Sequence, residues 1–165
     1  MRFNLHKLTL VSIIAAISAV GRIAFQFIPN FQPTTAIIII ASYFLGPLSG
    51  VLLAIVSTYL SNLVLGIGLW SIWQMFAWAM ISLLSSLLKK INLKKTLPIL
   101  IIIGVFAGFF YGAVFAFVNL LITNKFWPYY LAGLTFDLNH AISNVIFIVI
   151  LYKPMTRLFA NISIL

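Results

Sequence analysis

Apolar residues form six stretches along the 165-residue chain, separated by short segments that contain proline, glycine or basic residues. Several stretches approach the roughly 20 residues that are needed to cross a hydrocarbon core of about 30 Å. The pattern predicts membrane-spanning helices at residues 8–28, 33–46, 48–66, 71–89, 97–122 and 129–152.

The second stretch is the shortest of the six. At 1.5 Å per residue, about 14 residues reach only about 21 Å, which is less than the thickness of the hydrocarbon core. Pro33 suits the first turn of a helix, and Gly46-Pro47 followed by Gly50 makes a turn before the third stretch. We therefore expect a short, tilted second helix that is separate from the third.

The composition defines the broad class of the protein. Hydrophobic residues make up 64% of the chain and charged residues 7%, so we expect an all-α integral membrane protein with one six-helix domain over residues 1–165. A net charge of +9 in a soluble protein would suggest a nucleic-acid partner. Here the basic residues lie at the ends of apolar segments, as topology signals do, so no nucleic-acid partner is expected.

The basic residues also predict an orientation. With six spans and both termini in the cytoplasm, only Arg22 and Lys125 lie outside. If the second and third stretches formed one kinked helix, the N-terminus and the basic loop 89–95 would lie on opposite sides of the membrane. The basic residues predicted to lie inside are Arg2, Lys7, Lys89, Lys90, Lys94, Lys95, Lys153 and Arg157.

Small residues recur at a spacing of four in two of the predicted helices. Gly104, Gly108 and Gly112 form a stripe that lets a neighbouring helix approach closely, and we interpret it as internal packing. Ala15 and Ala19 have the same spacing in the first helix. They indicate either internal packing or a docking face for another membrane protein, and spacing alone favours packing.

A parallel ridge lies beside these alanines, formed by Ser12 and Ala16. The same two interpretations apply to this ridge.

Polar and aromatic residues are concentrated at the outer ends of the predicted helices. Each has an ordinary explanation, because tryptophan favours membrane interfaces, asparagine bonds between helices, and a lone membrane histidine is more often packed than liganding. Their concentration in one leaflet nevertheless predicts a substrate-binding site there. The candidate residues are Arg22, Gln26, Asn30, Gln32, Asn62, Trp70, Trp73, Gln74, Asn119, Asp137, His140 and Asn144.

Asp137 is the only acidic residue in the chain. Ionisable groups at membrane depth are costly and tend to mark functional sites. Arg22 is the natural cation for it near the outer leaflet, so we predict an ion pair, either purely structural or holding polar groups ready for a ligand.

Catalysis is not expected. One acidic residue cannot supply paired carboxylates, His6 and His140 lie on opposite sides, and the chain has no cysteine and no metal-site pattern. No phosphate-binding loop is present, so a partner must power any active transport. A proton-coupled carrier that uses Asp137 and His140 stays open as an alternative.

Four segments together resemble a known family. They are the region of Ala15 and Ala19, PNFQPTTAIIIIASYFLGPLSGVLLAI at 29–55, LGIGLWSIWQMFAW at 65–78 and FDLNHAISNVIF at 136–147. The chain resembles the S components of energy-coupling factor (ECF) transporters, small six-helix membrane proteins that capture vitamins and dock on a shared ATPase module. Among these proteins it looks most like the cobalamin-type branch.

The resemblance implies an outward-facing pocket built from the first loop and the outer helix ends, and it favours a docking role for Ala15 and Ala19. These alanines share a helical face with Arg22 and Gln26. One face can serve both the partner and the pocket only if the helix bends or unwinds near Gly21.

The resemblance also implies partners and a transport cycle. The S component would capture cobalamin or a corrinoid precursor outside a bacterial cell, topple in the bilayer and release it inside. A transmembrane coupling subunit and two ATPase subunits would drive the cycle, so ATP acts in the partners and no cofactor is expected in this chain. The alternatives are another vitamin (folate, pantothenate or riboflavin), a self-sufficient carrier, or a structural membrane protein.

Overall fold

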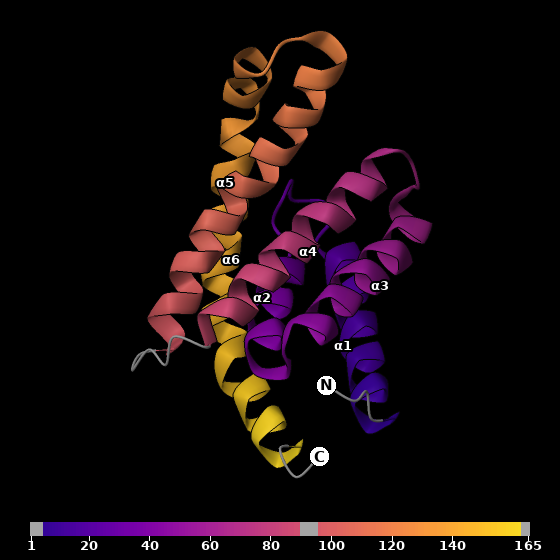
Figure 1. Ribbon diagram of the computed structural model, residues 1–165, viewed down its shortest axis with the longest axis vertical. Coiled ribbons are helices and arrows are strands. Elements are labelled where there is room, and N and C mark those ends of the chain that lie inside the picture. The colour runs from indigo at the N-terminus through magenta and orange to yellow at the C-terminus, as the bar shows by residue number, and fades with distance from the viewer. Residues whose placement is uncertain (1–4, 90–95, 163–165) are drawn as a thin grey trace.

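The computed structural model describes residues 5–89 and 96–162, and this part of the chain consists of helices and short connections without a strand. Five of the helices are long and apolar enough to cross a membrane, which confirms the predicted all-α membrane class. Figure 1 shows them as a bundle in which an α5–α6 hairpin extends beyond the ends of α3 and α4. The helices are α1 (Leu5–Ala24), α2 (Thr34–Leu45), α3 (Pro47–Leu65), α4 (Trp70–Leu88), α5 (Thr96–Thr123) and α6 (Trp127–Ile162).

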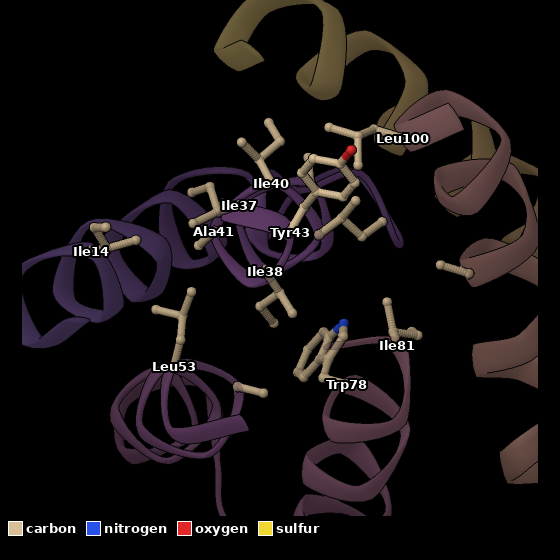
Figure 2. Close-up of a cluster of buried hydrophobic side chains, with 14 of the residues drawn as sticks. Ile14, Ile37, Ile38, Ile40, Ala41, Tyr43, Leu53, Trp78, Ile81 and Leu100 are labelled. Atoms are coloured by element: carbon tan, nitrogen blue, oxygen red, sulfur yellow. The ribbon is translucent and has the colours of Figure 1, made fainter. Parts of the chain in front are cut away.

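The short helix α2 forms the centre of the bundle. Its residues from Thr34 to Tyr43 are all buried, as expected for a helix that is apolar around its whole circumference. Figure 2 shows its isoleucines among Ile14 of α1, Leu53 of α3 and Trp78 of α4. At about 18 Å, α2 is too short to cross the bilayer by itself, but its surroundings are mostly protein rather than lipid.

Two predicted helix boundaries were wrong. The first helix ends at Ala24 and not at residue 28, so Gln26 lies in the following connection rather than on the helix. The last helix continues to Ile162 instead of ending at 152, although Pro154 within it lacks the N–H that would bond to the preceding turn.

The glycine stripe of α5 is an internal packing surface, as predicted. A Cβ at Gly108 would lie 2.6 Å from the backbone nitrogen of Ala141 in α6, closer than such atoms approach. A Cβ at Gly104 would lie 2.6 Å from Cδ1 of Ile148. The two helices therefore pack closely along this line, with backbone against backbone at Gly108, as small residues allow in membranes.

The described connections fall at two ends of the bundle. The α3–α4 and α5–α6 turns lie at the upper end of Figure 1, and the N- and C-terminal ends lie at the lower end. Lys7, Lys89, Lys153 and Arg157 belong to helix segments at the lower end. Of the other residues used to predict the orientation, Arg2, Lys90, Lys94 and Lys95 lie outside the described residues.

Candidate functional site

Two cavities border the α1–α2 connection, one on its side toward α3 and α4 and the other toward α5 and α6. The first, which we call the Arg22 cavity, has a volume of about 290 Å³. The second, the Asp137 cavity, has a volume of about 370 Å³. Asn30 and Tyr111 line both, so the cavities are neighbours on either side of these two residues.

Arg22 belongs to the last turn of α1. Within the described residues, its hydrogen bonds go to uncharged side chains. Its Nε donates to Oε1 of Gln32 at 3.1 Å, and its Nη1 donates to Oγ of Ser61 at 2.7 Å and to Oδ1 of Asn62 at 2.6 Å. The guanidinium carbon lies 5.2 Å from the centre of the Trp78 ring, within the range of a cation–π contact. Contacts from the α1–α2 connection, α3 and α4 thus fix the orientation of one cation beside the cavity.

Below this cation, Trp78 begins a chain of hydrogen bonds across the buried core. Its Nε1 donates to Oγ1 of Thr35 at 2.8 Å, and this oxygen lies 2.7 Å from Nε2 of His140. Because an indole N–H can only donate, Thr35 accepts from Trp78, and the same hydroxyl forms the second bond with the His140 ring. His140 is fully buried and stacks edge-on against Tyr111, so it joins α6 to α2 rather than facing a cavity.

The α1–α2 connection is fixed on α6. Nδ2 of Asn30 donates to the Phe136 carbonyl at 3.2 Å, and the Gln32 N–H donates to Oγ of Ser143 at 2.8 Å. Ser143 in turn donates to the Gln32 carbonyl at 3.1 Å. Asn30 has a φ of 57°, a left-handed conformation that asparagine tolerates better than most residues. These contacts hold Gln32 in place to accept from Arg22.

Asp137 lies on the face of α6 that packs against Gly112. A Cβ at Gly112 would overlap the carboxylate, so glycine is what makes room for it. The side chain is only 3% exposed and borders the Asp137 cavity together with Tyr129 and Tyr130. Its Oδ2 is buried without a hydrogen-bond partner.

The predicted Arg22–Asp137 ion pair was wrong for this structure. Within residues 5–89 and 96–162, Arg22 bonds to neutral side chains and Asp137 has no cationic partner. The two charges border different cavities, with Tyr111 lining both of these spaces. Each charge is therefore uncompensated within the described chain.

Comparison with protein families identifies the chain. A family model described as "ECF transporter, substrate-specific component" matches residues 6–156. The chain belongs to this family. Comparisons with curated proteins and with solved structures gave no match. Members of this family are transporter subunits that work with an ECF module of coupling and ATPase subunits, and they are not enzymes.

The ECF component gathers about half of the predicted site residues around the two cavities. Asn62 forms the layer behind Arg22, because its Nδ2 donates to Ser71 and Gln74 while its Oδ1 accepts from Arg22. The predicted residues that line a cavity are Arg22, Gln26, Asn30, Gln32, Gln74 and Asp137.

Other predicted residues of the ECF component lie elsewhere. Trp70 is half exposed, as an interfacial tryptophan would be, and neither it nor Trp73 lines the Arg22 cavity or the Asp137 cavity. Asn119 donates to the Lys125 carbonyl at the end of α5. Asn144 is fully buried and donates to the Gly104 carbonyl, so it belongs to helix packing.

Ala15 and Ala19 do not lie on an outer surface of the component. Both are buried on the face of α1 that packs mainly on α3, the same face that carries Arg22 inward. This placement removes the conflict between a partner face and a pocket face. Ser12 and Ala16 are small residues on the exposed side of α1.

Several cavity residues escaped the sequence analysis. Tyr111, Phe25, Tyr129 and Tyr130 are aromatic residues in apolar surroundings, where composition does not distinguish lining from packing. Gly112 did carry a signal, since it ends the predicted stripe. In the described part of the chain, no three His, Cys, Asp or Glu side chains gather as metal ligands would.

Proposed function

We propose that this ECF component captures a vitamin-sized organic molecule at the outer face of a bacterial cell membrane. A transmembrane coupling subunit and two ATPase subunits would then power its release inside. The observation that carries this proposal is the Arg22 cavity, where one cation is oriented by three neutral acceptors at the predicted outer end of the bundle. Preorganised polar groups in a small cavity are typical of ligand sites.

The cavity volumes bear on the choice of vitamin. Cobalamin is the substrate that the sequence resemblance favours, but cavities of about 290 and 370 Å³ are at the lower end of the roughly 300–1,000 Å³ typical of small-molecule sites. A corrinoid ring with its side groups is much larger than a molecule that such spaces enclose. The volumes favour a smaller vitamin, on the scale of pantothenate or riboflavin. Folate carries two carboxylates, whereas Arg22 is the one cation lining these cavities.

We further propose that the exposed face of α1 docks on the coupling subunit. Over an apolar stretch of 18 residues, α1 has 28% of its residues buried, compared with 33–44% in the other four long helices. Among these five helices, α1 is therefore the least covered by the rest of the chain. Ser12 and Ala16 let another helix approach closely, and the exposed side chains of Ile13 and Ile17 flank them. This face replaces the buried alanines as the candidate docking surface.

The decisive experiment is mass spectrometry of small molecules that the purified protein retains, followed by uptake measurements in cells with and without the ATPase module. We expect one retained vitamin and uptake only when the module is present. Uptake into liposomes that contain this chain alone would instead support a self-sufficient carrier. Failure to retain or bind any vitamin in the panel would overturn the proposal.

A further inference from the structure

The two uncompensated charges of the site are unusual for a membrane protein. An isolated charge at membrane depth is costly, and such residues normally pair with one another or serve a ligand. Arg22 and Asp137 do not pair with each other in this structure, and the acceptors around Arg22 are uncharged. Neither side chain has an oppositely charged partner within residues 5–89 and 96–162, so a bound molecule that carries both signs of charge would compensate both.

Asp137 has the features of a ligand contact rather than of a structural residue. It lies within α6, far from the first turn where a carboxylate would stabilise a helix end. Its Oδ2 is buried and makes no hydrogen bond, although tyrosines line the cavity beside it. Gly112 leaves just enough space for the carboxylate against α5.

The aromatic surroundings favour a positively charged group beside this carboxylate. Tyr111, Tyr129 and Tyr130 line the same cavity, and the faces of such rings attract cations. An ammonium or a protonated ring nitrogen would give Asp137 a charge-assisted hydrogen bond. On the other side of Tyr111, the Arg22 guanidinium would do the same for a carboxylate or a phosphate.

We propose that the ligand is a zwitterion whose anionic end contacts Arg22 and whose cationic end contacts Asp137. This inference rests on the proposed function and names the chemical class of its ligand. The ligand passes Asn30 and Tyr111, the two residues that line both cavities, and its central part packs on the Tyr111 ring. In the loaded protein the ligand supplies both missing counter-charges, so a molecule with no net charge binds between two groups of opposite sign.

A set of matched benzene derivatives tests this charge pattern. At pH 7, 4-(aminomethyl)benzoate is a zwitterion, 4-methylbenzoate an anion, 4-methylbenzylamine a cation and 4-methylbenzyl alcohol neutral. Homologues of the zwitterion with two to four methylene groups between ring and ammonium allow for the separation of the two charges. Binding to the purified full-length chain in nanodiscs is measured by titration calorimetry.

We expect the best zwitterion to bind about tenfold or more tightly than either singly charged analogue. Asp137→Asn should lower the affinity for the zwitterion to the affinity measured for the anion. Arg22→Gln should lower the affinity for the zwitterion to the affinity measured for the cation. Thermal unfolding of both variants without ligand shows whether they are folded. Gln26→Glu adds a negative charge at the edge of the Arg22 cavity and is an alternative in case the other variants do not fold. It should weaken the binding of the anion and of the zwitterion but not the binding of the cation.

The outcomes separate this inference from the proposed function. If the protein retains or transports a vitamin that is neutral or carries one sign of charge, the zwitterion proposal is wrong and the proposed function stands. If no zwitterion exceeds its singly charged analogues, the proposal is likewise wrong. If no vitamin and no probe of any charge binds, both fail together.

Discussion

Gly112 of α5 and Asp137 of α6 are in direct contact, with the carboxylate occupying the position that a Cβ at residue 112 would take. The contact continues the line along which Gly108 meets the backbone of Ala141. One stripe of glycines therefore serves two purposes, since it brings two helices together and leaves room for a buried acidic group. Helix packing and the candidate site are linked through this pair.

Replacing Gly112 with alanine should disturb the site more than the fold. The added methyl would overlap the carboxylate and move Asp137, so we expect the binding preference for zwitterions to be lost and stability to fall by about 1–3 kcal/mol. Calorimetry with the benzene derivatives and thermal unfolding in detergent measure the two effects.

Gly133→Ala is the matched control for Gly112→Ala. A Cβ at Gly133 meets nothing within 4 Å, and alanine is the better helix former by roughly 0.5–1 kcal/mol. We expect unchanged or higher stability. Because Gly133 itself lines the Asp137 cavity, this control applies to stability only, and an equal loss of stability in the two variants would contradict the close contact assigned to Gly112.

Thr35→Val should destabilise the protein through its two buried partners. The substitution removes the acceptor for Trp78 and the hydroxyl partner of His140, leaving both without this bond at a cost of about 1–3 kcal/mol each. Thr34→Val is the control, because Thr34 is equally buried but makes one long bond of 3.4 Å to the Ser18 carbonyl. If Thr34→Val lowers the melting temperature as much as Thr35→Val does, the loss of stability comes from removing any buried hydroxyl. It would then not depend on the bonds to Trp78 and His140.

Much of the fold could be predicted from hydrophobic length and turn residues. The six helices, the separate short α2 and the packing role of the glycine stripe follow from patterns that lie within single segments. The end of the molecule that holds the cavities was also predictable, because most of the asparagine and glutamine side chains that the sequence analysis singled out lie near it. Helix ends were less well predicted, since Phe25, Phe27 and Ile28 continue the apolar pattern beyond Ala24, where α1 ends.

The partners of individual side chains were not predictable. Arg22 and Asp137 are conspicuous as opposite charges, but nothing in the sequence shows that Ser61 and the predicted site residue Asn62 orient Arg22. Periodicity placed Ala15 and Arg22 on one face of α1 without showing that this face points inward. That direction depends on how α3 packs, which is a property of the assembled bundle.

The pair Ala15 and Ala16 separates packing from docking on α1. Ala15→Leu should lower stability by about 1–3 kcal/mol, because the site is fully buried and has no room for a larger side chain. The side chain at residue 16 points outward, so Ala16→Leu should leave stability and ligand binding unchanged. Copurification with the coupling subunit should fall. Thermal unfolding and pull-down of the ECF module measure these effects.

Ile13→Leu, also on the exposed side, is the control for a change that adds no bulk. The assignment would be wrong if Ala16→Leu copurified normally while a folded Ala15→Leu did not. The docking role would then belong to the buried residues Ala15 and Ala19.

The last prediction concerns the independence of Arg22 and Asp137 in the empty protein. Since no ion pair joins them within the described chain, the effects of Arg22→Gln and Asp137→Asn on the free energy of unfolding should add, with a coupling below about 0.5 kcal/mol. Trp78→Phe with Thr35→Val is the reference cycle, because these residues share a hydrogen bond and should show coupling of roughly 0.5–3 kcal/mol. With the best zwitterion bound, the Arg22–Asp137 cycle should become non-additive as well, because one molecule then contacts both charges. Strong coupling in the empty protein would instead restore the ion pair, and additivity in both states would show that no ligand joins the two residues.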